Sequence, residues 1–408
     1  MIRLKISASY CISIIYLVLV QSGITFAADE DSSCDHHVAQ WLDPANGDVV
    51  QVGEVFDRLS SARIVLLGEA HTTVAHHRWQ LYMLSALHSR HANLVVGFEM
   101  LPRRVQASLD DWSAGRLTEE EFLEQSEWQK VWGYDAGLYL PLLHFARLNR
   151  LSTVALNVDR KLVSQVSQRG WQALGEDERM GLSDPAPASD AYRNSLAELF
   201  AYKQLLSDAS EGEDSVEPDL DEILRSDAFS NFVEAQLTWD RAMAEALAAA
   251  HRRDPKAIVV GIVGRGHLEY GYGIPHQLAD MGIDDVDVLL PLDSTATCDP
   301  LPADLASAVF VVDAESETPA PPRPRLGIII EGSDAGVRVS QVVENSVAAQ
   351  CGLVEGDLIE AAAGFKTTTN AALIEIIQRQ APGTWLPLKV KRGDESLELL
   401  AKFPQSFE

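Results

Sequence analysis

Hydrophobic residues follow two alternating patterns along the first three quarters of the chain. Short, nearly uninterrupted apolar runs predict buried strands, and these runs are Arg63–Leu67, Asn93–Phe98, Thr153–Leu156, Ala257–Val263 and Val286–Leu290. Between them, apolar residues recur every three or four positions, which predicts amphipathic helices at Ala75–Arg90, Arg104–Ala114, Leu138–Arg150, Leu162–Leu174, Ala191–Leu206 and Ser226–Arg252. Such alternation is typical of an α/β fold with a mostly parallel sheet and helices on both faces.

A different pattern follows a proline-rich stretch. Residues 299–324 contain six prolines and predict a linker. Residues 325–404 then show short apolar segments around one helix at Asn370–Gln380, which predicts a small β-rich domain. With residues 40–298 as the α/β domain, the chain is expected to hold two domains.

The N-terminus has the layout of a secretory signal peptide. Arg3 and Lys5 precede an apolar run from Ile6 to Val20, and small residues follow at Ala27 and Ala28. The run is short for a membrane span, which needs about 20 apolar residues. Residues 1–27 are therefore expected to be removed, and the protein to be secreted across the inner membrane into the periplasm or cell envelope.

Three cysteines would remain after this cleavage. An oxidising compartment favours disulfides, and an odd number leaves at least one thiol unpaired. We expect a Cys34–Cys298 bridge that closes the first domain and a free thiol at Cys351.

The charge of the chain argues against nucleic acid and against an anionic membrane surface as partners. Lysine and arginine number 33 against 60 acidic residues, a formal net charge of −27. Nucleic-acid binding needs clustered cations to meet phosphates, so this balance argues against it, and against an anionic membrane surface. Residues 208–222 hold eight acids and no base, which indicates an exposed loop.

Polar side chains recur where the predicted strands end. Glu69 and His71 follow the first strand, Glu99 the second, and His267 the fourth, so that Gly-x-x-His occurs twice at equivalent strand ends. In open parallel sheets ligands bind beyond the carboxyl ends of the strands. We therefore expect His71, His267, Glu69 and Glu99 to bind a divalent transition metal, with Glu69 and Glu99 as catalytic acid or base.

Three further segments leave alternatives open. Arg103 and Arg104 follow the second strand and either meet an anionic group or lie on a solvated surface. The aromatic-rich segment Ser126–Pro141 forms either a packed connection between helices or a flat apolar wall for a ligand. His76 and His77 either point back to the site or are solvated or capping residues.

Residues 55–292 resemble the ChaN-like haem-binding uptake family of the Tiki superfamily. The matching motifs are Leu67-Gly68-Glu69-Ala70-His71, His76-His77, Gly97-Phe98-Glu99-Met100, Trp128 with Trp132-Gly133, Tyr139-x-Pro141-Leu142, Ala155-Leu156-Asn157 and the run from Gly264 to Pro275. The resemblance implies an envelope haem binder whose iron is held by a tyrosine and which dimerises around the cofactor. It makes Tyr270, and then Tyr272, the candidate haem ligands, with Arg103 and Arg104 beside the propionates. Other Tiki members resemble metal-dependent proteases, with the Gly-x-x-His histidines and nearby glutamates at the metal.

The C-terminal segment resembles a bacterial PDZ domain of the kind attached to envelope proteases. Leu326-Gly327-Ile328, Gly336-Val337, Gly352-Leu353 and Gly356-Asp357-Leu358 carry the resemblance. It implies that Leu326, Gly327 and Ile328 bind the C-terminal carboxylate of a peptide or protein, which would add a strand beside the helix.

Three hypotheses remain from the sequence. The chain is a haem-binding protein with a peptide-binding domain, a metal-dependent hydrolase to which the PDZ domain brings substrate, or an adaptor that has lost its chemistry. Residues 28–298 carry a net charge of −22, which favours a metal cation over anionic haem as the arriving ligand and keeps the second hypothesis open.

Overall fold

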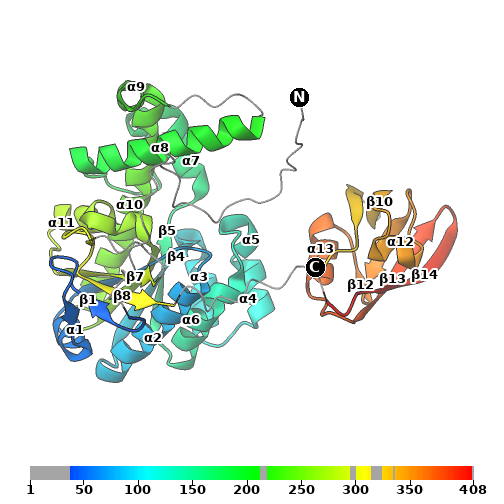
Figure 1. Cartoon of the computed structure of the whole chain (residues 1–408), viewed down its shortest axis with the longest axis horizontal. Coiled ribbons are helices and arrows are strands. Elements are labelled where there is room, and N and C mark those ends of the chain that lie inside the picture. Colours follow the sequence, from blue (N-terminus) through cyan, green and yellow to red (C-terminus); the bar gives the residue numbers. More distant parts are fainter. Residues whose placement is uncertain (1–36, 212–217, 295–299, 314–323, 334–335, 407–408) are drawn as a thin grey trace, which may run out of the picture.

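The computed structural model describes residues 37–211, 218–294, 300–313, 324–333 and 336–406 (Figure 1). The predicted signal peptide and the predicted Cys34–Cys298 bridge lie outside these residues. Cys351 is described and is a free cysteine. None of the described helices is both long and apolar enough to cross a bilayer.

An α/β domain contains an eight-stranded sheet in the order β2-β1-β8-β7-β3-β6-β4-β5. The strands are β1 (Trp41–Leu42), β2 (Val49–Val50), β3 (Ile64–Glu69), β4 (Leu94–Pro102), β5 (Ser152–Asn157), β6 (Ile258–Gly264), β7 (Val286–Asp293) and β8 (Ala308–Val312). The six strands from β8 to β5 are parallel, and β1 and β2 add an antiparallel edge. The fold class expected from the sequence is therefore confirmed.

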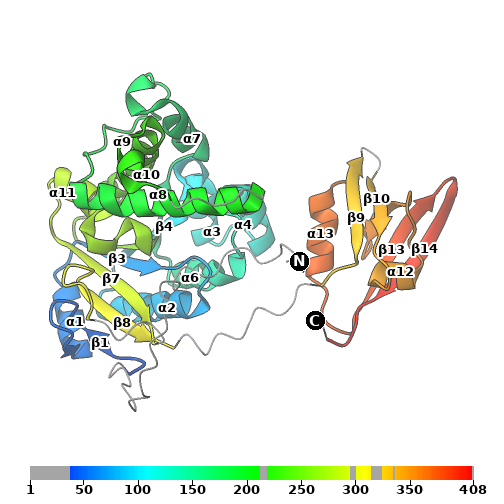
Figure 2. The same cartoon turned by 45° about the horizontal axis from the view of Figure 1, so that its top comes forward.

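Helices cover both faces of this sheet, as Figures 1 and 2 show. The helices are α1 (Val52–Leu59), α2 (Val74–Arg90), α3 (Gln106–Ser113), α4 (Glu119–Gln125), α5 (Trp128–Val131), α6 (Ala136–Leu148), α7 (Arg160–Arg169), α8 (Asp190–Glu211), α9 (Leu220–Arg225), α10 (Asp227–Arg253) and α11 (Ile274–Asp280). Along β3, Val65 and Leu67 pack with α1, α2 and α6 on one face. Ile64 and Leu66 pack with α10 and α11 on the other. Because both faces are buried, β3, β4 and β6 lack the polar alternation of a half-exposed strand.

The predicted linker differs from the structure in its first half. Residues 299–324 contain β8, an apolar run flanked by prolines in sequence, which pairs with both β7 and β1. The sheet of the first domain therefore extends to Val312, and the connection can begin only after it. Because β8 runs parallel to β7, it ends at the same edge of the sheet as β3, β4 and β6.

The second domain is an antiparallel sheet with two helices around its own core. Its elements are β9 (Ile328–Ser333), β10 (Gly336–Val342), α12 (Val347–Cys351), β11 (Leu358–Ala362), β12 (Phe365–Lys366), α13 (Asn370–Gln378), β13 (Trp385–Arg392) and β14 (Glu395–Lys402). The strand order is β14-β13-β11-β10-β9, with β12 paired to β11. The main-chain groups on the outer side of β9 pair with no described strand, so this strand forms an edge of the sheet.

Candidate functional site

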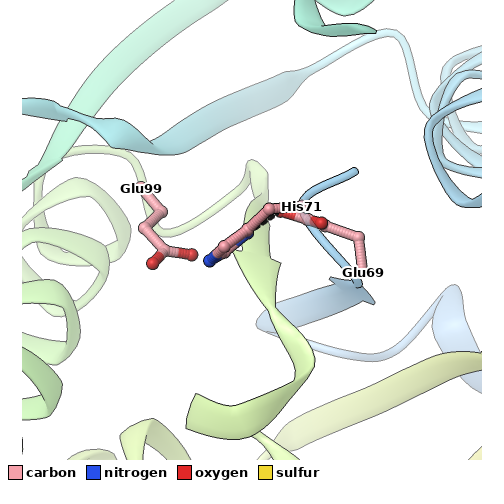
Figure 3. A group of neighbouring side chains, drawn as sticks. All are labelled: Glu69, His71 and Glu99. Atoms are coloured by element: carbon pink, nitrogen blue, oxygen red, sulfur yellow. Dashed lines mark hydrogen bonds and ion pairs between the residues drawn. The ribbon is translucent and has the colours of Figure 1, made fainter. Parts of the chain in front are cut away.

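Four of the residues singled out in the sequence meet at the carboxyl ends of three adjacent strands. Glu69 is the last residue of β3, Glu99 lies in β4, and His267 ends the short 3-10 helix η3 (Arg265–His267) after β6. Ligand atoms of Glu69, His71 and Glu99 all lie within 4.8 Å of one another (Figure 3). His267 Nε2 lies 3.6 Å from Glu99 Oε1, so the fourth residue joins the same cluster.

His71 is held by the first carboxylate. Its Nδ1 lies 2.6 Å from Glu69 Oε1, and Glu69 is almost fully buried. Burial works to lower the pKa of His71, but the hydrogen bond and charge of Glu69, with the charge of Glu99, raise it above its ordinary value. The other edge of the ring faces the Glu99 carboxylate (Figure 3).

His267 is held in the same way by a carboxylate from another element. Its Nδ1 lies 2.6 Å from Oδ1 of Asp240, a fully buried residue in α10. The phenol of Tyr192 donates to the second oxygen of Asp240 at 3.0 Å, which fixes the carboxylate. Burial opposes the charged imidazole, yet the charge and hydrogen bond of Asp240 raise the pKa of His267 to about 9.

Glu99 therefore lies between two imidazoles whose Nδ1 atoms are each bound to a carboxylate. Its Oε2 accepts a hydrogen bond from the backbone of Gly264 at 2.5 Å. A Cβ on Gly264 would lie 2.6 Å from His71 Cε1, 3.3 Å from His71 Nε2 and 3.4 Å from Glu99 Oε2. The glycine thus leaves the room in which the imidazole approaches Glu99.

This arrangement fits a metal ion. Metal-binding histidines commonly donate their second ring nitrogen to a carboxylate, which orients the ring and leaves the other nitrogen to the metal. His71 and His267 show this pattern on the two sides of Glu99, and imidazole with carboxylate is a ligand set of several transition-metal sites. The ligand atoms that lie within 4.8 Å of one another are those of Glu69, His71 and Glu99. Glu69 Oε2 is buried and accepts no hydrogen bond from the described residues, so one carboxylate oxygen is left for a further partner.

Buried polar groups fix the turn between β3 and α2. His76 accepts a hydrogen bond from the Ala70 backbone at Nδ1 and contacts Asp293 through Nε2. Tyr139 donates to Glu69 Oε1 and to the His71 carbonyl, both at 3.3 Å. His77 Nε2 also lies 3.2 Å from that carbonyl. The aromatic segment and the His76-His77 pair therefore both contribute to the site.

A cleft of about 390 Å³ opens above the cluster. Its walls are aromatic, with Trp132 and Tyr134 beside His71 at ring-centroid distances of 4.8 and 5.0 Å, and Trp239 beside His267. Three cations line the same cleft, namely Arg104, Lys130 and Arg160. The site thus combines imidazoles and a carboxylate at its floor with flat apolar walls and a basic rim.

The other residues expected at the site lie in different surroundings. Arg104 lines the cleft, whereas Arg103 donates to the Ala242 carbonyl and pairs with Glu245. The rings of Tyr270 and Tyr272 stack on each other at 5.2 Å, and neither is among the described residues that line the cleft. Tyr134 is the tyrosine that does line it.

Sequence reasoning missed Asp240. Its signal was present, because Asp240 occupies a place in the apolar stripe of α10 that continues through Leu237, Ala244 and Leu247. A carboxylate in such a stripe is costly to bury without a partner. It therefore indicates a buried cation or histidine nearby.

Comparisons with known proteins cover both domains. A family model described as haem-binding uptake, Tiki superfamily, ChaN matches residues 55–278, and a PDZ domain model matches residues 324–402. None of the curated proteins compared with the chain matches it.

Solved structures are similar to parts of the chain. The structure titled "Cofacial heme binding to ChaN of Campylobacter jejuni" is similar at 19% identity with a TM-score of 0.50, over 66% of this chain and 95% of that one. At this identity the likeness concerns the fold. The HtrA-type protease AlgW with a decapeptide is similar at 24% identity over 20% of this chain and 28% of that one, with a TM-score of 0.19. The HtrA3 PDZ domain bound to a phage-derived ligand is similar at 22% identity over 20% of this chain and 84% of that one, with a TM-score of 0.18.

Proposed function

The chain belongs to the ChaN family of haem-binding uptake proteins in the Tiki superfamily, and on that premise we propose that it binds haem in the aromatic cleft above His71 and His267. The single observation that carries the proposal is the cleft itself. Its walls are formed by Trp132, Tyr134 and Trp239, and a nitrogen ligand lies at its floor. A flat apolar macrocycle with two carboxylates matches aromatic walls and a basic rim.

Donors of two kinds that hold haem iron, imidazole and phenol, face this cleft. They are the imidazoles of His71 and His267 and the phenol of Tyr134. Bound haem would supply an iron centre, and His71 or Tyr134 would hold it in the cleft. Burial, together with the charges of Glu69 and Glu99, raises the pKa of Tyr134, which disfavours its phenolate before a cation arrives.

Titration of the full chain with haemin tests this proposal. We expect a saturable Soret band with one site, weakened in Trp132→Ala. A shift of the band in His71→Ala but not in Tyr134→Phe identifies the imidazole as the ligand, and the reverse identifies the phenol. Tyr270→Phe is the matched control, because that ring lies outside the cleft. Loss of the band in this control would contradict the proposed location.

Export is the second part of the proposal. We propose that residues 1–27 direct the chain across the inner membrane and that it acts in the cell envelope. The charged start, the apolar run and the small residues near Ala27 support this. N-terminal sequencing of the protein from an envelope fraction checks it, and a mature chain that still begins at Met1 would contradict it.

The second domain is a PDZ domain, and we propose that it binds the C-terminus of a peptide or protein. Gly327 precedes edge strand β9 with a φ of +78°, and its carbonyl accepts from Val343 at 2.9 Å. The Leu326 carbonyl accepts from Ala348 at 2.8 Å. These bonds fix the loop at the start of β9, where an added peptide strand would end. The homodimer implied by the family stays a prediction.

A metal-dependent hydrolase is the second candidate function, and the two carboxylate–imidazole pairs around Glu99 favour it. His71 Nε2, His267 Nε2 and Glu99 would hold a divalent ion, which would supply an activated water. Glu69, with one unsatisfied oxygen, is the group that could accept a proton beside it.

Metal analysis separates the two candidates. The hydrolase predicts stoichiometric metal in the purified full chain, lost in Glu99→Gln and retained in Glu127→Gln, a half-buried glutamate bound to Arg104 and Lys130. It also predicts chelator-sensitive cleavage that Glu69→Gln abolishes. Metal-free protein that binds haemin would exclude it.

A further inference from the structure

The three cations at the rim of the cleft differ in whether a carboxylate pairs with them. Arg104 forms ion pairs with Glu127 and Asp159, the latter at 2.9 Å. Lys130 pairs with Glu127 at 3.0 Å. For Arg160, no carboxylate of the described residues lies within ion-pair distance, and its one hydrogen bond among them goes to the Trp132 carbonyl at 3.3 Å. Arg160 is thus the cation of this rim whose charge is left without a counter-charge.

The position of Arg160 places this charge beside the chemistry of the site. It is the first residue of α7, it is exposed, and it lines the cleft. Its charge acts on Tyr134, where it favours the phenolate, and the Tyr134 ring lies 5.0 Å from that of His71. Tyr134 therefore lies between the Arg160 guanidinium and the His71 imidazole at the cleft floor.

An unpaired guanidinium is unexpected in this domain. Residues 28–298 have a net charge of −22, so carboxylates are abundant in this part of the chain. A guanidinium offers five donors in a planar fork that matches a carboxylate. Only one of these donors is used by a described residue, and at a long distance.

From this combination we propose that Arg160 forms a carboxylate-recognition subsite on the wall of the cleft, with Arg104 and Lys130 adding positive charge. The subsite takes a carboxylate that is carried by the ligand bound over His71. The inference rests on the proposed function, because two sources would supply that group. A haem propionate is the source if the cleft binds haem, and a peptide C-terminal carboxylate is the source if the cleft is a hydrolase site.

Haemin and its dimethyl ester test the first source, because they differ only in the propionate charges. Both are titrated into the full chain at one ionic strength, with the Soret band as the measurement. Since a hydrogen bond between two charged groups is stronger than one between neutral groups, we expect haemin to bind at least about tenfold more tightly than its ester. Arg160→Gln should remove this preference by weakening haemin alone.

Lys161→Gln is the matched control. It removes the same charge from the next residue of α7, which is exposed and does not line the cleft. It should leave both affinities unchanged. Equal affinities of the unaltered chain for haemin and ester, or equal losses for both in Arg160→Gln, would overturn the inference even though haem binding itself is retained.

A labelled tripeptide tests the second source. It is prepared as its free acid and as its C-terminal amide, and the binding of each to the chain loaded with Co²⁺ is measured. Binding of the acid alone, lost in Arg160→Gln, would support the subsite with a peptide as its ligand. If haemin does not bind in that case, the haem proposal fails and the inference survives. If neither acid nor haemin shows dependence on Arg160, the inference is wrong.

Discussion

Asp240→Asn is the change that tests the electrostatics of the site most directly. The substitution keeps the shape of the side chain and its contact with the Tyr192 phenol, but it removes the charge bound to His267 Nδ1. That charge is the largest of the effects that raise the pKa of His267 against its burial. Without it, burial should bring the pKa of His267 back toward or below its ordinary value.

The size of the effect follows from the pKa. In the folded chain the pKa of His267 is about 9, against 6.5 for an ordinary histidine. One pKa unit corresponds to 1.36 kcal/mol, so the protonated imidazole contributes on the order of 3 kcal/mol to the free energy of unfolding. Because the folded pKa is raised, this contribution is fully present below pH 6.5 and is lost as the pH rises through 9.

Urea unfolding of metal-free, haem-free protein between pH 6 and 9.5 measures this contribution. Tryptophan fluorescence reports mainly on the α/β domain, because Trp385 is the sole tryptophan of the second domain. We expect the free energy of unfolding of the unaltered chain to fall by about 3 kcal/mol relative to Asp240→Asn between pH 6.5 and 9. Asp285→Asn removes an exposed carboxylate paired with Arg63, and its free energy of unfolding should depend on pH in the same way as that of the unaltered chain. Parallel curves for Asp240→Asn as well would refute the reasoning.

Four further outcomes are expected. Gly264→Ala should displace His71, since the new Cβ would lie 2.6 Å from Cε1; calorimetry should show weaker metal or haemin binding, with stability lowered by about 1–3 kcal/mol. Asp357→Asn should destabilise the PDZ domain by about 1.5–3 kcal/mol, because the buried side chain loses its charge-assisted hydrogen bonds to the partly exposed Arg392. Since Arg392 and the Val354 backbone lower the pKa of Asp357 against its burial, the amide protection factors of that domain, which correct hydrogen exchange for its intrinsic pH dependence, should fall as the pH falls through this lowered pKa. Gly327→Ala should abolish peptide binding in fluorescence titrations, because the φ of Gly327 is +78° and the added Cβ would clash with the Cβ of Ser346.

The parallel sheet could be predicted from the sequence because its strands are buried on both faces. Continuous apolar runs such as those of β3 and β6 have few other places in a folded domain. The strand β8 was harder to detect, since a five-residue apolar run among prolines resembles a linker. Its pairing with β7 in the structure identifies it as a strand.

The site was predictable in its strand-end residues and not in its orienting ones. Strand ends meet at one edge of a parallel sheet, so Glu69, His71, Glu99 and His267 could be grouped from their positions alone. The contribution of Asp240 depends on how α10 packs across the sheet, which sequence spacing does not give. Tyr270 follows His267 by three residues in sequence, but a φ of +57° at Tyr270 redirects the chain there.

The end of β8 sets a geometric limit on what the PDZ domain can do. The last strand of the first domain is β8, which lies two strands from β3 in the sheet. Because β8 is parallel to β7, its carboxyl end lies on the same side of the sheet as the cleft. Residues 313–325 then connect it to the PDZ domain, and a chain of that length spans at most about 45 Å when fully extended. This length limits the distance between the end of β8 and the start of the PDZ domain, so a polypeptide captured by the PDZ domain would be tethered near the cleft. Short tethers of this kind give local concentrations of about a millimolar, so a weak PDZ ligand could still occupy the cleft without any contact between the two domains.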